Sequence, residues 1–434
     1  MKVLVTNTRN VQAYAIIRAL RPHAQKIVAT VYGGNRFVAL LSHAARSRLV
    51  DKRYYVPSPI ADWREGNIGP ENTEREEAYV RAVERICEAE GIDTIFPSWD
   101  PQVYVFSKNK ARFAKMGVLI PTPDYETVVT PLDKYRTLRA AEAVGFPCPR
   151  TYLPERIEDL KRIARDERFP LVIKPRFSSA GRGIEVVRDF PELVERVSAV
   201  RERHGVPMVQ QYIAGWESQN FYLVLDRNGE AKSTFSDRKI RHFFRHTATF
   251  PTAAETWHPH PQLSQATRLL QHLGWWGGAT VQTKVDAHDG VAKLMEVNPR
   301  LGLRLWTRTE LGINEPLMCI KIALGEKVQE VNKYPAGTIL LDFVEDMLGL
   351  GFRLADLLVY RLRIDVCGKT PVDPSNPPLT LRDLVRSYGY TYLGGRKRVF
   401  DPYTRYALRD PLVSLLWWLQ FVTFVRAGFG QIGR

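Results

Sequence analysis

A short alternating run of polar residues, Glu296-Val-Asn298-Pro-Arg300, offers the clearest chemistry in the sequence. Residues two apart on a strand project from the same face, so Glu296 and Asn298 would lie side by side. A carboxylate and an amide oxygen are hard ligands that suit Mg²⁺, which also binds phosphate oxygens. If the strand continues past Pro299, Arg300 can neutralise charge on a transferring phosphoryl group. Gln282, on a neighbouring apolar segment, is a further candidate ligand or orienting group. The alternative is an edge strand with a polar face.

A loop of small residues is the second candidate for chemistry. An apolar strand ends in Lys174 and is followed by Ser178-Ser179-Ala-Gly181-Arg-Gly183. Small residues let backbone N–H groups approach phosphate oxygens, and the lysine supplies a point charge. The lysine precedes the glycines, so this is neither a Walker A loop nor a G-x-G-x-x-G turn. The alternative is a hairpin turn with a solvated lysine.

A third candidate follows the next apolar strand, over Val209 to Glu217. An extended segment can offer backbone C=O and N–H groups to an adenine edge, and a nearby carboxylate can accept hydrogen bonds from ribose hydroxyls. Glu217 as a solvated turn residue is the alternative.

Over roughly residues 130–325, these segments resemble the ATP-grasp superfamily in their order and spacing. The resemblance implies that Lys134 and Lys174 contact nucleotide phosphates, with Ser178 to Gly183 as the flexible loop. It also implies adenine recognition by a hinge of Gln210, Gln211, Tyr212 and Ile213, and ribose binding by Glu217. Gln210 departs from the pattern, because an acidic residue is common at that position.

The same resemblance implies a metal site and a set of reactive cations. Gln282, Glu296 and Asn298 resemble the metal-binding trio of carbamoyl-phosphate synthetase domains and would hold Mg²⁺, with Mn²⁺ as the alternative ion. Arg300 would steady an acyl phosphate. The segment Ser236 to Arg241 resembles a basic strand of the predicted carboxylate–amine ligases in this superfamily, in which Lys239 is preferred over Arg241. The expected catalytic residues are therefore Arg300, Lys239 and Lys174.

Regular elements that could position these residues are readable along the chain. The order of strand 2–6, helix 11–20 and strand 26–31 is a βαβ signature and predicts a parallel sheet. A helix over 71–90 and a strand over 94–96 lead to a loop whose Asp100 is a candidate ligand or helix cap. Further along, the pattern predicts a helix from Thr130 to Val144, a hairpin over 221–234, a helix over 261–273, and a hairpin of 277–285 with 291–297.

The predicted fold class is α/β, in the α+β form of ATP-grasp proteins. A length of 434 residues suggests about two to three domains. We expect a parallel α/β domain over 1–125, an ATP-grasp domain over 126–332 with lobes near 150–230 and 235–325, and a mostly helical extension over 333–434.

The net charge of +15 suggests anionic partners or an arginine-rich surface. The four cysteines form no C-x-x-C pair, and the first residues lack the apolar core of a secretory signal, so a cytoplasmic location is expected. The segment 370–378 is proline-rich and predicts a loop. The apolar run 412–425, with Trp417 and Trp418, is either a buried core helix or an interfacial helix, and the second case would place the protein at the inner membrane surface.

Together these features predict an ATP-dependent ligase that activates a carboxylate as an acyl phosphate and joins it to an amine. Its partners would be small-molecule acids and amines, nucleic acid is not an expected partner, and an oligomer is allowed. Three alternatives stay open: a bicarbonate-using carboxylase or carbamoyl-type enzyme, an RNA-modifying ligase, and a nucleotide-binding module without catalysis. The sequence does not identify the acid or the amine.

Overall fold

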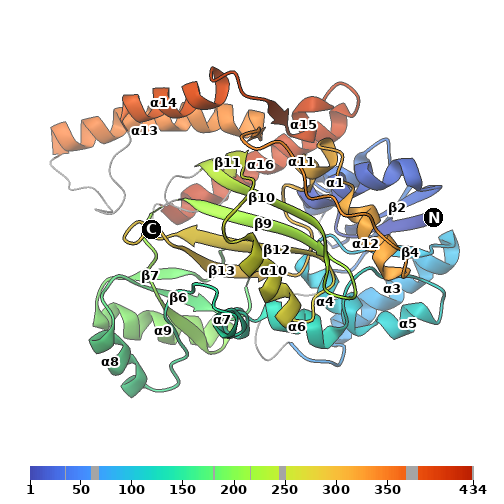
Figure 1. Ribbon diagram of the computed structural model, residues 1–434, viewed down its shortest axis with the longest axis horizontal. Coiled ribbons are helices and arrows are strands. Elements are labelled where there is room, and N and C mark those ends of the chain that lie inside the picture. The colour runs from blue at the N-terminus through green and yellow to red at the C-terminus, as the bar shows by residue number, and fades with distance from the viewer. Residues whose placement is uncertain are drawn as a thin grey trace.

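The computed structural model describes residues 1–434 except 35, 60–67, 179–180, 216, 244–250, 368–379 and 433–434. Its described strands form three sheets, each covered by helices (Figure 1). The expected α/β architecture with a parallel N-terminal sheet and a helical C-terminal segment is confirmed.

The N-terminal sheet is parallel, with strand order β3-β2-β1-β4. Its first strand is buried from Val3 to Val5, and separate apolar clusters cover the two faces of the sheet. Burial on both faces explains why these strands are almost continuously apolar. The strands are β1 (Lys2–Val5), β2 (Lys26–Tyr32), β3 (Lys52–Val56) and β4 (Thr94–Phe96), and the helices are α1 (Val11–Leu20), α2 (Arg36–Leu40), α3 (Glu74–Glu90), α4 (Asp100–Lys108) and α5 (Lys110–Ala114).

The central sheet has seven described strands in the order β13-β12-β9-β10-β11-β14-β15. Both predicted hairpins are present, as β9–β10 and β12–β13. The strands are β9 (Ser218–Leu225), β10 (Ala231–His242), β11 (Pro251–Thr256), β12 (Gly277–Val285), β13 (Ala292–Asn298), β14 (Ile339–Leu341) and β15 (Arg398–Phe400), with helices α10 (Leu263–His272), α11 (Leu305–Glu310) and α12 (Glu315–Ala323). The last two strands come from beyond residue 333, so the C-terminal region continues this sheet.

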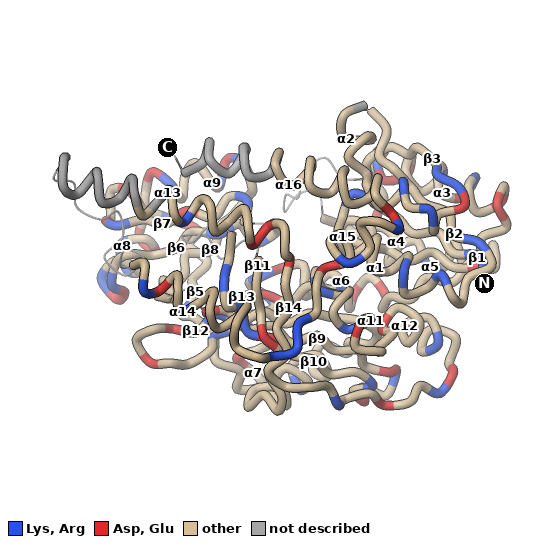
Figure 2. The backbone as a smooth tube through the Cα atoms, turned by 90° about the horizontal axis from the view of Figure 1, so that it is seen from above, with Lys and Arg blue, Asp and Glu red and all other residues tan. Residues whose placement is uncertain are grey.

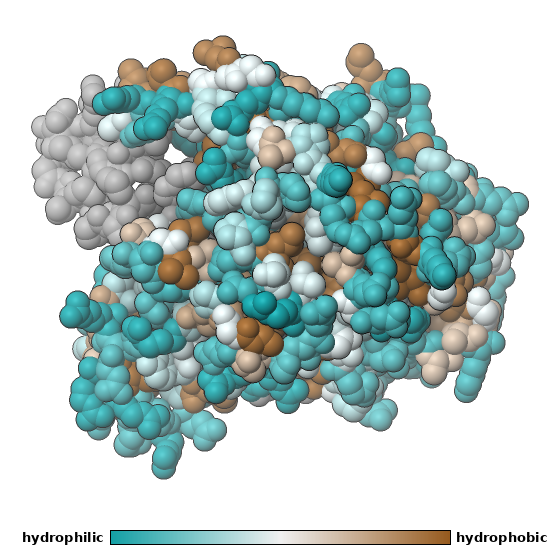
Figure 3. All heavy atoms as spheres, in the orientation of Figure 1, coloured by the Kyte–Doolittle hydropathy of each residue, from teal (hydrophilic) through white to brown (hydrophobic). Residues whose placement is uncertain are grey.

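A small lobe, at lower left in Figure 1, carries the third sheet in the order β5-β8-β6-β7. Its apolar core is its own and lies between the sheet and two helices. Its elements are β5 (Thr151–Tyr152), α8 (Ile157–Asp166), β6 (Leu171–Pro175), β7 (Glu185–Val187), α9 (Phe190–His204) and β8 (Pro207–Gln211). The sheet of this lobe ends at Gln211, because β9 pairs with β10 and β12 in the central sheet. Hydrophilic residues cover most of the face shown in Figure 3, including this lobe.

Two helices, α6 (Tyr125–Leu132) and α7 (Lys134–Ala143), precede the small lobe. The predicted single helix from Thr130 to Val144 was wrong at its start, because Asp133 interrupts the chain with extended backbone angles. Its carboxylate accepts hydrogen bonds from the amides of Tyr135 and Arg136, which caps α7 and leaves Lys134 as the first helical residue.

The C-terminal region lies across the top of the molecule in Figure 1, with α13 and α14 side by side. Its helices are α13 (Phe343–Cys367), α14 (Leu381–Tyr392), α15 (Pro402–Arg405) and α16 (Pro411–Ile432). Just before α16, Asp410 accepts hydrogen bonds from Tyr14 and Ser47, which ties the end of the chain to the N-terminal domain. The predicted loop 370–378 lies outside the described residues. Among the described residues, no helix combines the length and apolar character needed to cross a bilayer.

Candidate active site

Strand register gathers the polar candidates on one face of the central sheet. Gln282 lies opposite Glu296 on one side and opposite Asn220 on the other, and Asn220 lies opposite Asp237. Side chains of directly opposed residues project from the same face, and residues two apart share it. The face therefore also carries Asn298, after Glu296, and Lys239, after Asp237. The other face is apolar and packs on α10 through residues such as Phe221, Val281 and Val297.

A chain of polar contacts links the first expected phosphate lysine to the expected metal ligands. Lys134 Nζ lies 3.9 Å from Glu296 Oε2. Asn298 Nδ2 donates to Glu296 Oε1 at 3.3 Å, and Arg300 donates to Asn298 Oδ1 at 3.1 Å. Lys134 Nζ also donates to the backbone carbonyl of Ser178 at 2.5 Å, which attaches the glycine loop to the same cluster. Residues more than 160 positions apart in the chain thus meet at one point.

Lys174, at the end of β6, points into this cluster. Its Nζ donates to Gln210 Oε1 at 2.6 Å, and Gln210 in turn donates to Thr151 Oγ1 at 2.8 Å. Burial lowers the pKa of Lys174 to about 8, against the opposing effect of the Glu296 carboxylate and with reinforcement from Lys134. Lys174 and Glu296 therefore interact across the two sheets rather than lying on opposite surfaces.

The expected glycine loop and adenine hinge connect the small lobe to the central sheet. Gly181 and Gly183 both have φ of +73°, a conformation that favours glycine, and Ser179 lies outside the described residues. The hinge begins at Gln211, whose amide donates to the carbonyl of Arg150, and continues through Tyr212 and the buried Ile213. The side chain of Gln210 is occupied by Lys174 and Thr151, and its backbone lies within β8 between β5 and β6, so the part of the hinge left to face a base is the segment after Gln210.

The ribose-binding candidate, Glu217, stands at the entry to β9. Its carboxylate accepts one hydrogen bond, from Gln219 Nε2 at 3.1 Å, and its carbonyl accepts from the amide of Val285. Gln219 is one residue out of step with Asn220, so this contact places the Glu217 carboxylate on the side of the strand away from the metal candidates.

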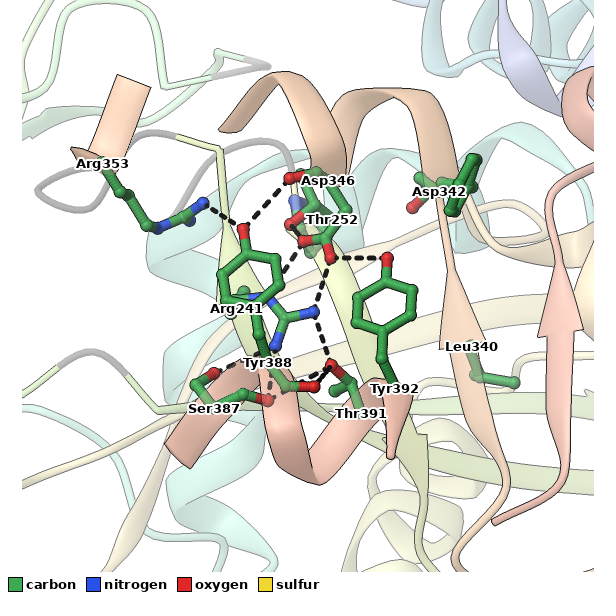
Figure 4. Close-up of polar contacts among 12 residues, drawn as sticks. Arg241, Thr252, Leu340, Asp342, Asp346, Arg353, Ser387, Tyr388, Thr391 and Tyr392 are labelled. Atoms are coloured by element: carbon green, nitrogen blue, oxygen red, sulfur yellow. Dashed lines mark hydrogen bonds and ion pairs between the residues drawn. The ribbon is translucent and has the colours of Figure 1, made fainter. Parts of the chain in front are cut away.

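Lys239 and Arg241 have different surroundings, although they lie two apart in the basic strand. Lys239 is buried with Nζ 3.6 Å from Asp237 Oδ1, and desolvation lowers its pKa. Arg241 instead forms an ion pair with Asp346 at 2.5 Å and donates to Ser387 and Thr391, as Figure 4 shows. Arg241 thus joins β10 to the C-terminal helices, which leaves Lys239 as the lysine of this strand that faces the polar cluster.

The N-terminal domain adds an acidic and an aromatic residue beside Arg300. Arg300 Nε lies 2.8 Å from Asp100 Oδ1, and its guanidinium carbon lies 4.1 Å from the centre of the Trp99 ring. Asp100 is the first residue of α4 and is not its cap, since no side-chain cap bond is present there. The loop at the carboxyl end of β4 was a candidate from the sequence, but its pairing with Arg300 was not predicted.

Three other polar residues near the site were missed at the level of sequence. Tyr222 donates to Asp237 at 3.1 Å, and Asn220 donates to Tyr222 at 2.9 Å. Lys284, on β12, adds a positive charge that also lowers the pKa of Lys174. The two-residue alternation of Asn220 with Tyr222, and of Asp237 with Lys239, was the available signal for a shared face.

The donor set suits a metal ion only together with phosphate oxygens. Among the described residues, no group of three or more His, Cys, Asp or Glu side chains is placed to hold an ion. The trio of Gln282, Glu296 and Asn298 offers one carboxylate and two amide oxygens. Mg²⁺ keeps six oxygen ligands and commonly takes several from substrate phosphates and water, which fits so sparse a set.

Comparison with known proteins identifies the central part of the chain. Residues 133–331 match the family described as "Carbamoyl-phosphate synthase L chain, ATP binding domain". The matched span includes every expected nucleotide, metal and catalytic residue.

Two curated relatives in sequence are large-chain proteins of carbamoyl phosphate synthase. It is 25% identical over 272 residues to the N-terminal section of the large chain from Methanopyrus kandleri, which covers 59% of this chain and 48% of the relative. The large chain from Methanobrevibacter smithii is 23% identical over 265 residues, covering 57% and 24%. This chain thus aligns with about half or less of the length of these relatives.

Solved structures show the same fold in biotin carboxylases. The biotin carboxylase domain of 2-oxoglutarate carboxylase from Hydrogenobacter thermophilus, in complex with MgADP, ADP and bicarbonate, has a TM-score of 0.61 at 19% identity and covers 78% of this chain and 73% of that one. Biotin carboxylase from Campylobacter jejuni has a TM-score of 0.60 at 16% identity, with coverage of 76% and 72%.

Proposed function

We propose that this protein is an ATP-dependent ligase that activates a substrate carboxylate as an acyl phosphate and joins it to an amine. The observation that carries the proposal is the convergence of two phosphate-type lysines on the Glu296–Asn298–Arg300 strand end. Lys134 reaches Glu296 at 3.9 Å, and the charges of Lys134 and Glu296 both act on Lys174. The relatives named as carbamoyl phosphate synthases support ATP-driven acid activation as the reaction class.

In the proposed first step, a carboxylate oxygen of the substrate attacks the γ-phosphorus of ATP. The bond from that phosphorus to the β,γ-bridging oxygen breaks, and ADP leaves with that oxygen. Lys134, Lys174 and the backbone of the glycine loop hold the phosphates, and positioning with charge neutralisation is the main contribution a protein makes to such a transfer. Gln282, Glu296 and Asn298 would hold Mg²⁺, which supplies further neutralisation of the phosphate oxygens when bound.

In the second step, an amine nitrogen attacks the acyl carbon, phosphate leaves, and the nitrogen loses a proton. The carbonyl oxygen gains negative charge on the way, and Arg300 is the nearest cation to the strand end where this happens. Asp100 and the Trp99 ring hold the guanidinium of Arg300 from two sides, which fixes its direction before substrate arrives. Lys239, buried beside Asp237, is proposed to bind the transferring phosphoryl group or the acid.

A bicarbonate-using reaction is the second candidate, and a specific finding favours it. The relatives are named as carbamoyl phosphate synthases, and one solved neighbour of the same fold was crystallised with bicarbonate. Bicarbonate would be activated by the same attack on the γ-phosphorus. The two candidates therefore differ in the acid rather than in the machinery.

The deciding experiment measures ADP release by the full-length protein with panels of acids and amines, in buffer depleted of CO₂. Stimulation by an organic acid and an amine together supports the first candidate, and stimulation by added bicarbonate supports the second. ADP release that no acid and no amine changes would refute both.

A matched pair of variants tests the site itself. Glu296→Gln removes the carboxylate of the metal set, and we expect a loss of at least about hundredfold in ADP release with the fold retained. Glu195→Gln makes the same change on the exposed face of α9 and should leave the rate unchanged. Wild-type rates in folded Glu296→Gln protein would contradict the assignment.

Several expectations remain proposals for the protein as a whole. We propose small-molecule acids and amines as partners, and a cytoplasmic location. The charge of +15 is the observation behind an RNA-modifying role, and salt-sensitive RNA binding would be its test. Self-association is allowed by the proposal but is not needed by it, since the site described above is assembled within one chain.

A further inference from the structure

The C-terminal helix α16 has an exposed stripe made only of apolar side chains. Leu412, Leu415, Leu419 and Val422 have exposed fractions of 49%, 51%, 49% and 53%. Their spacing of three, four and three residues places them along one side of the helix. On the opposite side, Val413, Leu416 and Phe421 are buried against the protein. One side of α16 is therefore packed in the core, and the other side is an uncovered apolar surface. The helix has features of both alternatives given above, a buried core helix and an interfacial helix.

The polar face that a solvent-exposed helix normally carries is missing here. Residues 411–425 include no charged side chain, and Figure 2 shows the described part of α16 without blue or red. Two further apolar residues, Leu348 and Phe352 on α13, are also exposed. Phe243 links the two helices, with ring-centre distances of 4.9 Å to Phe421 and 5.5 Å to Phe352.

A second exposed apolar group lies on α2, just before a segment that contacts α16. Phe37 and Leu40 of the short helix α2 are 57% and 47% exposed. They directly precede His43, which contacts Gln420 at 3.3 Å and Tyr403 at 2.9 Å. The N-terminal region thus has two exposed apolar residues near in sequence to its contact with α16.

The two segments that carry this surface are mostly basic, although Arg405 is paired with Glu310 at 2.5 Å. Residues 36–49 contain three arginines and no acidic residue, and residues 402–426 contain three arginines and one acid. That acid, Asp410, is buried and accepts hydrogen bonds from Tyr14 and Ser47. Exposed Arg48 and Arg409 are therefore not balanced by an exposed carboxylate from either segment.

We propose that this surface docks on an anionic lipid bilayer, with α16 lying along the membrane plane. The apolar stripe would enter the boundary between headgroups and acyl chains, and the arginines would contact lipid phosphates. A second copy of this chain fits less well. It would bring two arginine rims and two molecules of charge +15 together without opposing carboxylates. The buried face of α16 fixes its orientation, so docking needs no rearrangement of the fold.

The proposal is tested by co-sedimentation of the full-length protein with vesicles. The vesicles contain either phosphatidylcholine alone or phosphatidylcholine with about one third phosphatidylglycerol. We expect binding to the anionic vesicles and at least tenfold weaker binding to the neutral ones. Leu415→Gln with Leu419→Gln should reduce binding to anionic vesicles at least tenfold, because two half-exposed leucines lose their transfer to the apolar layer.

Matched controls keep the test specific. Leu393→Gln changes a leucine that is 85% exposed at the end of α14, and it should bind like the wild type. Arg409→Gln should weaken binding to anionic vesicles about fivefold and leave binding to neutral vesicles unchanged. Point substitutions are preferred to removal of α16, because removal would also uncover the surface that Val413 and Phe421 bury.

Two outcomes would overturn the proposal. One is equal sedimentation of the wild type and the Leu415→Gln, Leu419→Gln variant, with circular dichroism showing that both are folded. The other is wild-type protein that ignores vesicles but forms a concentration-dependent dimer in light scattering, which the same double substitution abolishes. The second outcome would assign the surface to another copy of the chain.

Discussion

The lowered pKa of Lys174 gives a prediction about nucleotide binding that can be worked out from the structure. The amine is buried, and its pKa of about 8 lies below the ordinary lysine value of 10.5. Only the ammonium form can offer a charge to phosphates. In the nucleotide-free protein, this form dominates at pH 7 and falls to about one molecule in ten at pH 9. If binding requires it, the Kd for ATP should rise about tenfold between pH 7 and pH 9.

The lowered pKa of Lys174 also affects the stability of the fold. Stability rises with pH, whereas nucleotide binding weakens. A lysine with a lowered folded-state pKa binds fewer protons in the folded protein than in the unfolded chain. Stability of the nucleotide-free protein therefore rises as pH increases from about 8 towards 10.5. A difference of 2.5 pKa units corresponds to about 3 kcal/mol, which is the cost of burying the ammonium below pH 8. The protein thus accepts a stability cost where nucleotide binding is strongest.

The assay is a titration with a fluorescent ATP analogue and Mg²⁺ at pH values from 6.5 to 9.5. Lys174→Arg keeps a positive charge throughout and should show little change in Kd across this range. Lys174→Met should bind more weakly at every pH, with an equally flat profile. Lys161→Met, on the exposed face of α8, should reproduce the wild-type curve. A wild-type Kd that stays constant to pH 9.5, or that rises equally in the arginine variant, would refute the reasoning.

Three further predictions concern the residues that support the site. Asp100→Asn weakens the ionic hold on Arg300, so kcat should fall about tenfold or more while the KM for ATP stays the same; an unchanged kcat would contradict it. Asp346→Asn leaves Arg241 buried without its carboxylate, and urea denaturation should show a loss of about 3–5 kcal/mol in the free energy of unfolding, whereas a loss below about 1 kcal/mol would count against the pair. Gly302→Ala should destabilise the fold by about 1–3 kcal/mol in the same assay, because the new Cβ would lie 2.3 Å from a ring carbon of Tyr222. Wild-type stability of this variant would mean that the Tyr222 ring moves freely.

The sequence was sufficient for those parts of the fold and site that depend on local pattern. Alternation by two predicted that Glu296 and Asn298 share a face, and strand register bears out that geometry. The Asn228-Gly229 turn predicted the β9–β10 hairpin, and the βαβ order predicted the parallel N-terminal sheet. Such features are readable because each is decided within about ten residues.

Pairings between distant segments could not be predicted from the sequence. Asp100 meets Arg300 across 200 positions, and Arg241 meets Asp346 across 105. A charge in the sequence indicates that a partner is needed when it is buried, but it does not say which one. The same limit applies to β14 and β15, because three-residue strands at the edge of a sheet carry too little periodicity to be separated from loops.

The helix break at Asp133 shows a related limit. The sequence favours a continuous helix, but a carboxylate can compete for backbone amides, and here it does so one residue before Lys134. Arg176 also forms an ion pair with Asp133, so a residue of the small lobe helps to hold the break. The interruption turns the chain just before Lys134, the lysine proposed to bind phosphate.

The C-terminal region has a mechanical consequence for the whole molecule. Two of its strands extend the central sheet, and the residues around α16 are bonded to Tyr14 and Ser47 near the other end of the chain. The C-terminal region therefore joins the N-terminal domain to the central sheet, and we expect these parts to behave as one rigid unit. The small lobe has a separate apolar core, so among the described parts we expect it to move relative to that rigid unit. Admission of nucleotide and expulsion of water would then depend on the movement of the small lobe alone.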